Sequence, residues 1–392
     1  VVKMTIPVKK ISSFCKTGSG GTPSRSNNAF FENGTIPWVK SGELKNRYIT
    51  EVEEYITELA VEKSSAKLVS KGSLLIAMYG ATVGEVSQLT FDATTNQAIC
   101  NIEPDENVCD VNYLYRFLEA SKSYLLSRRV GGGQPNISQG VIKDLDVPLP
   151  PLAEQRRIAS ILDQADELRQ KRQQAIEKLD QLLQATFIDM FGDPASNPKG
   201  WNLGKLGDVI HSAKDGPHVS PNYSETGIPF LSTRHVRAGK IVWDDLKFIT
   251  EEDAQIHWKK CKPTRGDILY TKGGTTGLAA VVDTDLDFAV WVHVALLKTN
   301  HDKVRSEWLV SMLNTQYCYE QSQRYTHGIA NRDLGLKRMV NIEMYIPSLD
   351  EQDKFVNFKN KLMKNNLLFE NSNSYFEQLF KSLQNQAFNG TL

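Results

Sequence analysis

The sequence predicts a mixed α/β (α+β) protein that is duplicated internally, each copy being an α/β domain followed by one long helix. Three observations predict this class: landmarks recur in the same order, short apolar strand-like runs lie inside each copy, and a helical apolar stripe ends each copy. We expect a pseudo-two-fold relation between the copies and an antiparallel coiled coil between the two helices. The expected segments are 1–150, 151–194, 195–348 and 349–392, alternating globular domain and helix.

The duplication rests on motifs that return at a nearly constant spacing. A repeat of this length is a whole domain with an attachment, because solenoid units repeat every ~20–50 residues. The paired landmarks are "IPWVKSGEL" from Ile36 and "IPFLSTRHV" from Ile228, "KGSLLIAMYGATVGEV" from Lys71 and "RGDILYTKGGTTGLAA" from Arg265, "GGGQPNIS" from Gly131 and "THGIANRD" from Thr326, and "EQRRI" from Glu154 and "EQDKF" from Glu351.

Each globular part begins with strand candidates. "SLLIAMY" (73–79) and "DILYT" (267–271) are compact apolar runs bounded by glycine, and "NQAICNIEP" and "FAVWVHVALLKT" follow as further strands. The amphipathic segments 111–129 and 306–324 predict one helix each. The proline-bearing strands "LDVPLPP" and "IEMYIPS" then close each globular part.

One long helix ends each copy, from about 153 to 191 and from about 350 to 388. A helix of this length spans ~55 Å, too long to be buried against its own small domain. Pairing of the two helices is the economical way to cover their apolar stripes. We assign to the coiled coil Ile158, Leu162, Ile176, Leu179, Leu183, Phe355, Leu362, Phe369, Phe376 and Phe380.

Composition limits the class of protein. The chain has 392 residues, 40% of them apolar, and no apolar run of the ~18 residues that a membrane span needs. The start "VVKMTIPVKKI" is too short and too charged for a signal peptide. Five scattered cysteines without a CxxC pair disfavour a disulfide framework and a zinc site. We therefore expect a cytoplasmic protein with reduced thiols and no bound metal.

Local charge indicates an anionic ligand, although 46 basic and 46 acidic residues cancel over the whole chain. Segments 121–143, 231–240 and 324–338 each hold several basic residues with at most one acidic residue. All three lie in polar loop regions of the two copies. A nucleic-acid footprint depends on such local patches and not on the average.

Signatures of catalysis are weak. The turns "GATVGEV" and "GGTTGLA" lack the lysine of a phosphate-binding loop, and "GGGQPN" follows a predicted helix, which is the wrong context for a dinucleotide loop. The triplets "ELK" (43–45) and "DLK" (245–247) resemble nuclease sites only in part. A binding protein is favoured. The alternatives are a nuclease or methyltransferase with a degenerate site, and a coiled-coil scaffold that does not bind DNA.

The motifs as a set resemble the specificity (S) subunit of type I restriction–modification enzymes over essentially the whole chain. The resemblance is carried by "GSGGTPSRSNNAFFENGTIPWVKSGEL" (18–44), "LLIAMYGATVGEV" (74–86), "GGGQPNIS" (131–138), "VPLPPLAEQRRIASILDQAD" (147–166) and their diverged second copies. The second helix departs from the pattern, with Asp353–Lys354 where the first has Arg156–Arg157.

This resemblance implies a function without catalysis. Segments 1–150 and 195–348 would be target recognition domains, each reading one half of a bipartite, asymmetric site in double-stranded DNA. The paired helices would set the spacer and dock two methyltransferase (M) subunits, which restriction/translocase (R) subunits join. The resemblance implies no cofactor for this chain, with S-adenosylmethionine, ATP and Mg²⁺ belonging to the partners.

Candidate DNA contacts follow from residue type and loop position. Basic side chains suit phosphates and guanine, and amides suit adenine. The candidates are Lys40, Lys45, Arg47, Tyr79, Thr82, Arg128, Arg129, Gln134 and Asn136 in the first copy, and Arg234, His235, Arg237, Tyr270, Lys272, Thr275, Thr276, Arg324, Asn331 and Arg332 in the second.

Overall fold

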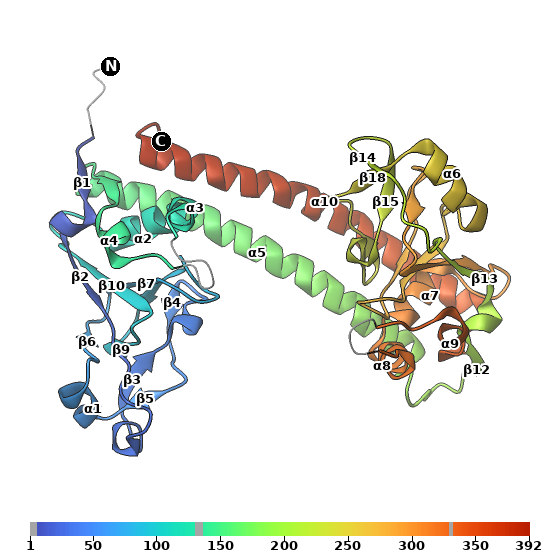
Figure 1. The fold of residues 1–392 in the computed structure, drawn as a ribbon, viewed down its shortest axis with the longest axis horizontal. Helices are drawn as coiled ribbons and strands as arrows, with labels where there is room; N and C mark the ends of the chain where they lie inside the picture. The colour runs from blue at the N-terminus through green and yellow to red at the C-terminus, as the bar shows by residue number, and fades with distance from the viewer. Residues whose placement is uncertain (1–5, 130–135, 329–331) are drawn as a thin grey trace. The chain divides into compact units, whose positions relative to one another are not determined.

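The computed structural model describes residues 6–129, 136–328 and 332–392, with the backbone alone for residues 365–374. The chain forms two compact units, which we call unit 1 (1–174 with 371–392) and unit 2 (175–370). Two long helices, α5 (Leu152–Phe191) and α10 (Leu349–Asn389), each give one part to either unit (Figure 1). The two long helices expected from the sequence are confirmed.

Unit 1 is built on three sheets. A five-stranded sheet has the order β2-β10-β7-β8-β4, a four-stranded sheet has the order β5-β3-β9-β6, and β1 pairs with β11. The strands are β1 (Val8–Lys10), β2 (Cys15–Ser19), β3 (Ile36–Val39), β4 (Tyr48–Ile49), β5 (Tyr55–Ile56), β6 (Leu68–Val69), β7 (Leu74–Ala77), β8 (Val86–Leu89), β9 (Ala93–Thr95), β10 (Ile99–Pro104) and β11 (Asp146–Pro148). The shorter helices are η1 (Ile11–Ser13), η2 (Asn28–Phe30), η3 (Ser41–Glu43), α1 (Glu58–Lys63), α2 (Val111–Ala120), α3 (Lys122–Ser127) and α4 (Gln139–Lys143).

Unit 2 repeats this topology. Its order β13-β22-β19-β20 corresponds strand for strand to β2-β10-β7-β8, and β18-β15-β21 corresponds to β5-β3-β9. The strands are β12 (Asn202–Lys205), β13 (Ile210–Asp215), β14 (Tyr223–Ser224), β15 (Ile228–Leu231), β16 (Val236–Arg237), β17 (Lys240–Ile241), β18 (Lys247–Ile249), β19 (Ile268–Thr271), β20 (Ala279–Val281), β21 (Ala289–Val290), β22 (Val294–Thr299) and β23 (Glu343–Ile346). The shorter helices are η4 (Leu206–Val209), η5 (Thr233–His235), α6 (Glu251–Lys260), α7 (Ser306–Leu313), α8 (Gln316–Tyr325) and α9 (Leu336–Met339).

The central strands are buried on both faces, which explains their continuous apolar runs. Leu74 and Ile76 of β7 enter the core beneath α2 and α5, while Leu75 enters the core on the opposite face. In β19, Ile268 packs against the core that holds α7, and Leu269 faces the other way. Side chains alternate between the faces of a strand, so a strand covered on both sides must be apolar throughout.

The single helices expected over 111–129 and 306–324 are each broken in two, so these predictions are wrong in detail. At the first break, the Ser121 hydroxyl donates to the carbonyl of Phe117 at 2.7 Å. At the second, the side chain of Asn314 exchanges two 2.9 Å hydrogen bonds with the backbone of Ala279. Thr315 then caps α8. Polar side chains that bond to nearby backbone groups compete with helix continuation.

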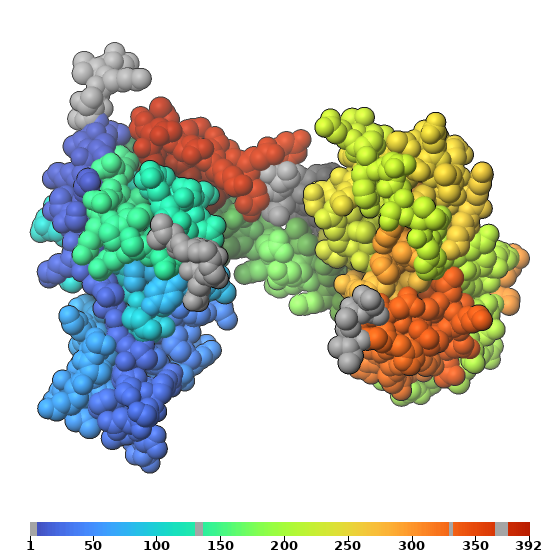
Figure 2. All heavy atoms as spheres, viewed as in Figure 1, coloured from blue at the N-terminus to red at the C-terminus, as the bar shows by residue number. Residues whose placement is uncertain are grey.

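In unit 1 the two long helices run antiparallel. Arg157 of α5 donates to the Leu392 carbonyl at 3.0 Å, and Arg169 lies 3.2 Å from Glu377, so positions rise along one helix as they fall along the other. In Figure 2 the C-terminal part of α10 (red) lies against the rest of unit 1. It contacts α2, where Phe388 packs edge-on against Phe117 at 5.3 Å. Each helix therefore contributes to the domain core as well as to the pair.

In unit 2 the opposite helix ends meet. Phe187 and Phe191 of α5 pack on Phe355 of α10, with ring centroids 5.3 and 5.7 Å apart, and Phe191 also contacts Trp308 of α7. Aromatic pairs at such distances favour the edge-to-face arrangement seen here. The start of α10 thus packs on the end of α5 in the core to which α7 also belongs.

The residues assigned to the coiled coil fall into two environments. One group is buried in the unit cores, and the other group is half-buried. Ile158, Leu162, Phe355 and Phe380 belong to the first group, and Ile176, Leu179, Leu183, Leu362 and Phe376 to the second. The side chain of Phe369 lies outside the described residues.

A buried glutamine anchors each long helix to its domain. Gln155 donates to the carbonyls of Val108 and Pro150 and accepts from the amide of Asp110, at 2.8–3.0 Å. Gln352 makes the same three bonds, accepting from the Arg305 amide at 2.8 Å. The recurring "EQ" motif therefore satisfies backbone groups where the helix leaves the domain, and buried backbone groups require such partners.

Two further features concern the chemistry of the chain. All five cysteines are free thiols. Across residues 6–129, 136–328 and 332–392, no helix combines the length and the apolarity that crossing a membrane requires.

Candidate nucleic-acid interface

Unit 2 contains an open cleft of about 870 Å³, which we call the basic cleft. The Gly-rich turn after β19 forms one side, and the segment from Arg332 into α9 forms another. Cationic or titratable side chains of His218, His293, Arg332, Lys337 and Arg338 line it, together with Lys272. A concave surface with this charge attracts polyanions.

Carboxylates neutralise part of the basic cleft. Lys272 lies 3.3 Å from Asp215 and 3.1 Å from Asp333, and Lys260 lies 2.5 Å from Asp215 on its other side. Burial alone disfavours the charged form of Asp215, but the hydrogen bond from Lys260 and the charge of Lys272 outweigh it and lower the pKa of this carboxyl. Asp215 is therefore ionised at neutral pH and holds both lysines.

The structure corrects four predicted contacts of the second domain. Tyr270 is fully buried in the core, and His235 and Thr276 are 2% exposed, so none of the three can reach a ligand. Burial, and secondarily Arg234, lowers the pKa of His235, so its imidazole is neutral and accepts from the Ser232 amide at 2.9 Å. Lys272, 4% exposed, is held by its two carboxylates. The position of Tyr270, Lys272 and Thr276 beside a glycine-rich turn, and that of His235 in a basic segment, suggested an exposure that the fold does not give.

The other candidates of the second domain lie at the surface, apart from Asn331, which is outside the described residues. Arg234 is engaged with the Asp245 carboxylate at 2.8 Å and with its backbone carbonyl. Arg332 donates to the Gln323 side chain at 2.5 Å through one guanidinium nitrogen, and its other N–H groups are not used in this bond. Arg237, Thr275 and Arg324 are exposed.

Several first-domain candidates have structural partners. Lys40 lies 2.7 Å from Glu53 and 3.0 Å from Glu54, and the Thr82 hydroxyl donates to the Ser41 carbonyl. Arg47 turns towards α5 and lies 2.7 Å from Asp163. We therefore correct the prediction that Arg47 contacts DNA directly, because its guanidinium binds the long helix α5.

The remaining first-domain candidates differ in exposure. Tyr79 is half-buried against the core, and Lys45 and Asn136 are exposed, while Gln134 lies outside the described residues. Arg128 and Arg129 are exposed at the end of α3. Arg128 stacks over the Tyr124 ring at 5.2 Å, and Arg129 donates to the carbonyl of Leu126.

Ion pairing separates the cations into two classes. A lysine or arginine that already faces a carboxylate gains little by exchanging it for a phosphate, whereas an unpaired exposed cation gains from releasing counterions. Within the described ranges, Lys45, Arg128, Arg129, Arg237, Arg324, Arg332 and Lys337 have no carboxylate within ion-pair distance. Lys337 and His218 were not singled out from the sequence. Lys337 lies in the basic segment 324–338, which is the sequence signal that could have identified it.

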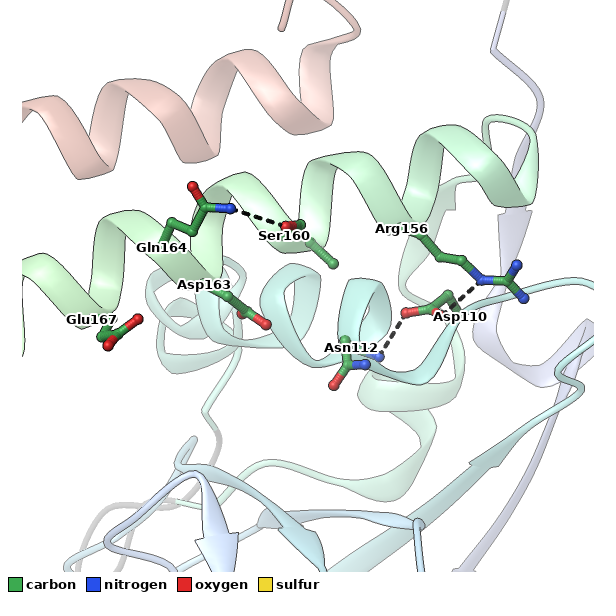
Figure 3. A pocket seen from close by; sticks show the side chains of 8 residues that line it. Asp110, Asn112, Arg156, Ser160, Asp163, Gln164 and Glu167 are labelled. Atoms are coloured by element: carbon green, nitrogen blue, oxygen red, sulfur yellow. Dashed lines mark hydrogen bonds and ion pairs between the residues drawn. The ribbon is translucent and has the colours of Figure 1, made fainter.

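A second, smaller pocket in unit 1 has the opposite charge (Figure 3). It measures about 250 Å³, lies between the first turn of α2 and α5, and is lined by Asp110, Asp163 and Glu167 among others. Asp110 caps α2 by accepting from the amide of Asn112 at 3.0 Å, and lies 3.5 Å from Arg156. The other two carboxylates also have cationic partners, Asp163 with Arg47 and Arg116, and Glu167 with Lys171.

Comparison with known proteins identifies relatives of both halves. The family model described as "Type I restriction modification DNA specificity domain" matches residues 5–178 and again 198–374. The MjaIX specificity subunit of Methanocaldococcus jannaschii is 28% identical over 316 residues, which cover 75% of this chain and 72% of that protein. The EcoR124I/EcoR124II specificity subunit of Escherichia coli is 33% identical over 165 residues, 41% of each chain.

Solved structures support the fold. The crystal structure of an S subunit of a type I restriction–modification system from M. genitalium superposes with a TM-score of 0.59 at 16% identity. The match covers 99% of this chain and 97% of the other.

Proposed function

The chain belongs to the type I restriction–modification DNA specificity family, and from this premise we propose that its two family domains each read one half of a bipartite, asymmetric DNA site. The observation that carries the proposal is a duplicated topology with unlike side chains. The two copies share their strand order, yet corresponding positions differ, since the residue after β19 is Lys272, paired with two carboxylates, and the residue after β7 is the apolar Met78. Two similar frames with different side chains suit two different half-sites.

We assign the segments accordingly. Residues 1–150 and 195–348 would be target recognition domains, and residues 151–194 and 349–392 would be helical segments that set the spacer. The chain itself would perform no chemistry in the cytoplasm, and S-adenosylmethionine, ATP and Mg²⁺ would serve its partner subunits. Chains of this family carry names as specificity subunits of type I enzymes, which supports the assignment.

Two methyltransferase subunits and the restriction/translocase subunits are the proposed protein partners. A structure of similar fold, at a TM-score of 0.58, is described as concerning complex assembly of the type I system.

Binding to DNA should depend steeply on salt because of the unpaired cations of the basic cleft. We expect Arg332→Gln and Lys337→Gln each to reduce the slope of log affinity against log salt by about 1. The measurement is fluorescence anisotropy of a mixed-sequence duplex with the full chain in complex with its methyltransferase subunits, over a salt series.

Arg234→Gln is the matched control, because Arg234 is exposed in the same unit but already paired with Asp245. Its slope should stay close to that of the wild type. A shallow dependence of affinity on salt for the wild type would contradict DNA binding. Equal slopes for the wild type and the three variants would show that the basic cleft does not contact DNA.

A further inference from the structure

In both copies the same backbone hydrogen bond holds the residues that lead into the last short helix, α4 in unit 1 and α9 in unit 2. In unit 1 the Ile137 amide donates to the Met78 carbonyl at 2.7 Å, and in unit 2 the Leu334 amide donates to the Lys272 carbonyl, also at 2.7 Å. Met78 and Lys272 therefore occupy corresponding positions at the end of corresponding strands, β7 and β19.

Their side chains are equally buried but chemically different. Met78 is 6% exposed and belongs to the apolar core, whereas Lys272 is 4% exposed and lies between Asp215 and Asp333. A desolvated lysine is tolerated when carboxylates compensate its charge in fixed geometry. Such a group restricts the arrangement of the elements it joins more than an adaptable methionine does.

Lys272 joins three separate elements at the basic cleft. Asp215 ends β13, Lys272 follows β19, and Asp333 lies shortly before α9. Asp333 and His327 exchange backbone hydrogen bonds of 2.9 and 3.0 Å, and the Gly274 amide donates to the carbonyl of Arg332 at 2.9 Å. The ion pairs thus fix the position from which the neighbouring Arg332 side chain faces the cleft.

We propose that Lys272 is a positioning residue that determines the specificity of the second recognition domain without touching DNA. It holds Arg332 and Asp333 against the Gly-rich turn, so that the side chain of Arg332 meets the DNA in one register. The inference rests on the proposed function, since it assumes that the basic cleft lies at DNA. The first domain uses Met78 and apolar packing for the same task.

The test is Lys272→Met, which introduces the side chain of the first copy. The variant should fold, because Asp215 keeps Lys260 as its partner and Asp333 is half exposed, with Arg338 3.9 Å away. The probe is the duplex that methylome sequencing identifies for the wild-type complex, together with its single-base-pair variants in each half-site. We expect discrimination to fall by about tenfold or more in one half-site and to stay unchanged in the other.

Lys298→Met is the matched control, because Lys298 pairs at 2.5 Å with the buried Asp267 in the same sheet and does not line the basic cleft. It should lower the unfolding midpoint and leave discrimination intact in both half-sites. Unchanged discrimination in folded Lys272→Met, or an equal loss in both half-sites, would overturn the proposal. A wild-type complex that recognises no bipartite site would instead refute the proposed function itself.

Discussion

A heptad inserted into both long helices is expected to lengthen the spacer of the recognised DNA by about three base pairs, with both half-sites unchanged. Seven residues extend a helix by ~10 Å, and base pairs are stacked every ~3.4 Å. A heptad also keeps the apolar stripe on the same face. The insertions belong between Gln174 and Ala175 in α5 and between Glu370 and Asn371 in α10, where each helix passes from one unit to the other.

The readout is selection from duplexes with randomised spacers, using the complex with methyltransferase subunits. Affinity for the original site should fall on the order of 10³-fold, because one half-site is then out of reach. A heptad in α5 alone is the control and should weaken binding to every spacer, since it shifts the helices past each other. Changed half-sites with an unchanged spacer would contradict the role of the helices as a ruler.

Replacing Arg116 by methionine is expected to destabilise unit 1 by about 2–3 kcal/mol, the cost of removing the charge-assisted hydrogen bonds of a buried guanidinium while Asp163 keeps Arg47 and Asp166 keeps Arg169. Arg116 is 1% exposed, donates to Asp163 at 2.7 Å and lies 3.1 Å from Asp166, both on α5. It also lies 2.9 Å from Glu119. Asp166, 5% exposed, would remain buried with Arg169 as its nearest cation.

Urea unfolding followed by circular dichroism measures this loss. The control is Arg305→Met, which removes a pair with Asp353 at the corresponding junction of unit 2. That pair is half-exposed, so water and salt screen it and the loss should be smaller. Equal losses for the two variants would show that the buried network adds nothing beyond an ordinary surface pair.

The features predicted correctly from the sequence are those with a local signal. Alternating and continuous apolar runs located β7 and β19, and recurring motifs revealed a duplication that the matching strand orders confirm. The helical stripe gave α5 and α10 because no glycine or proline interrupts either. The breaks at Ser121 and Asn314 were missed, since the bonds of Asn314 to Ala279 depend on tertiary structure.

The candidate site was harder to predict because the availability of a cation depends on distant residues. Arg47 is engaged by Asp163 and Lys272 by Asp215, partners far away in sequence, whereas Lys337 has no carboxylate partner among the described residues. Residue type alone cannot separate these cases. A tyrosine such as Tyr270, at the end of a strand and next to a Gly-rich turn, also looks exposed until the covering helix is known.

The central claim, two domains reading two half-sites, is tested most directly by hydroxyl-radical footprinting of the full chain with its methyltransferase subunits on the methylated target duplex. We expect two short protected tracts separated by a gap of unprotected or weakly protected base pairs. In the same experiment, Arg332→Gln should weaken protection of one tract only. A single continuous tract, or equal weakening of both, would contradict the account.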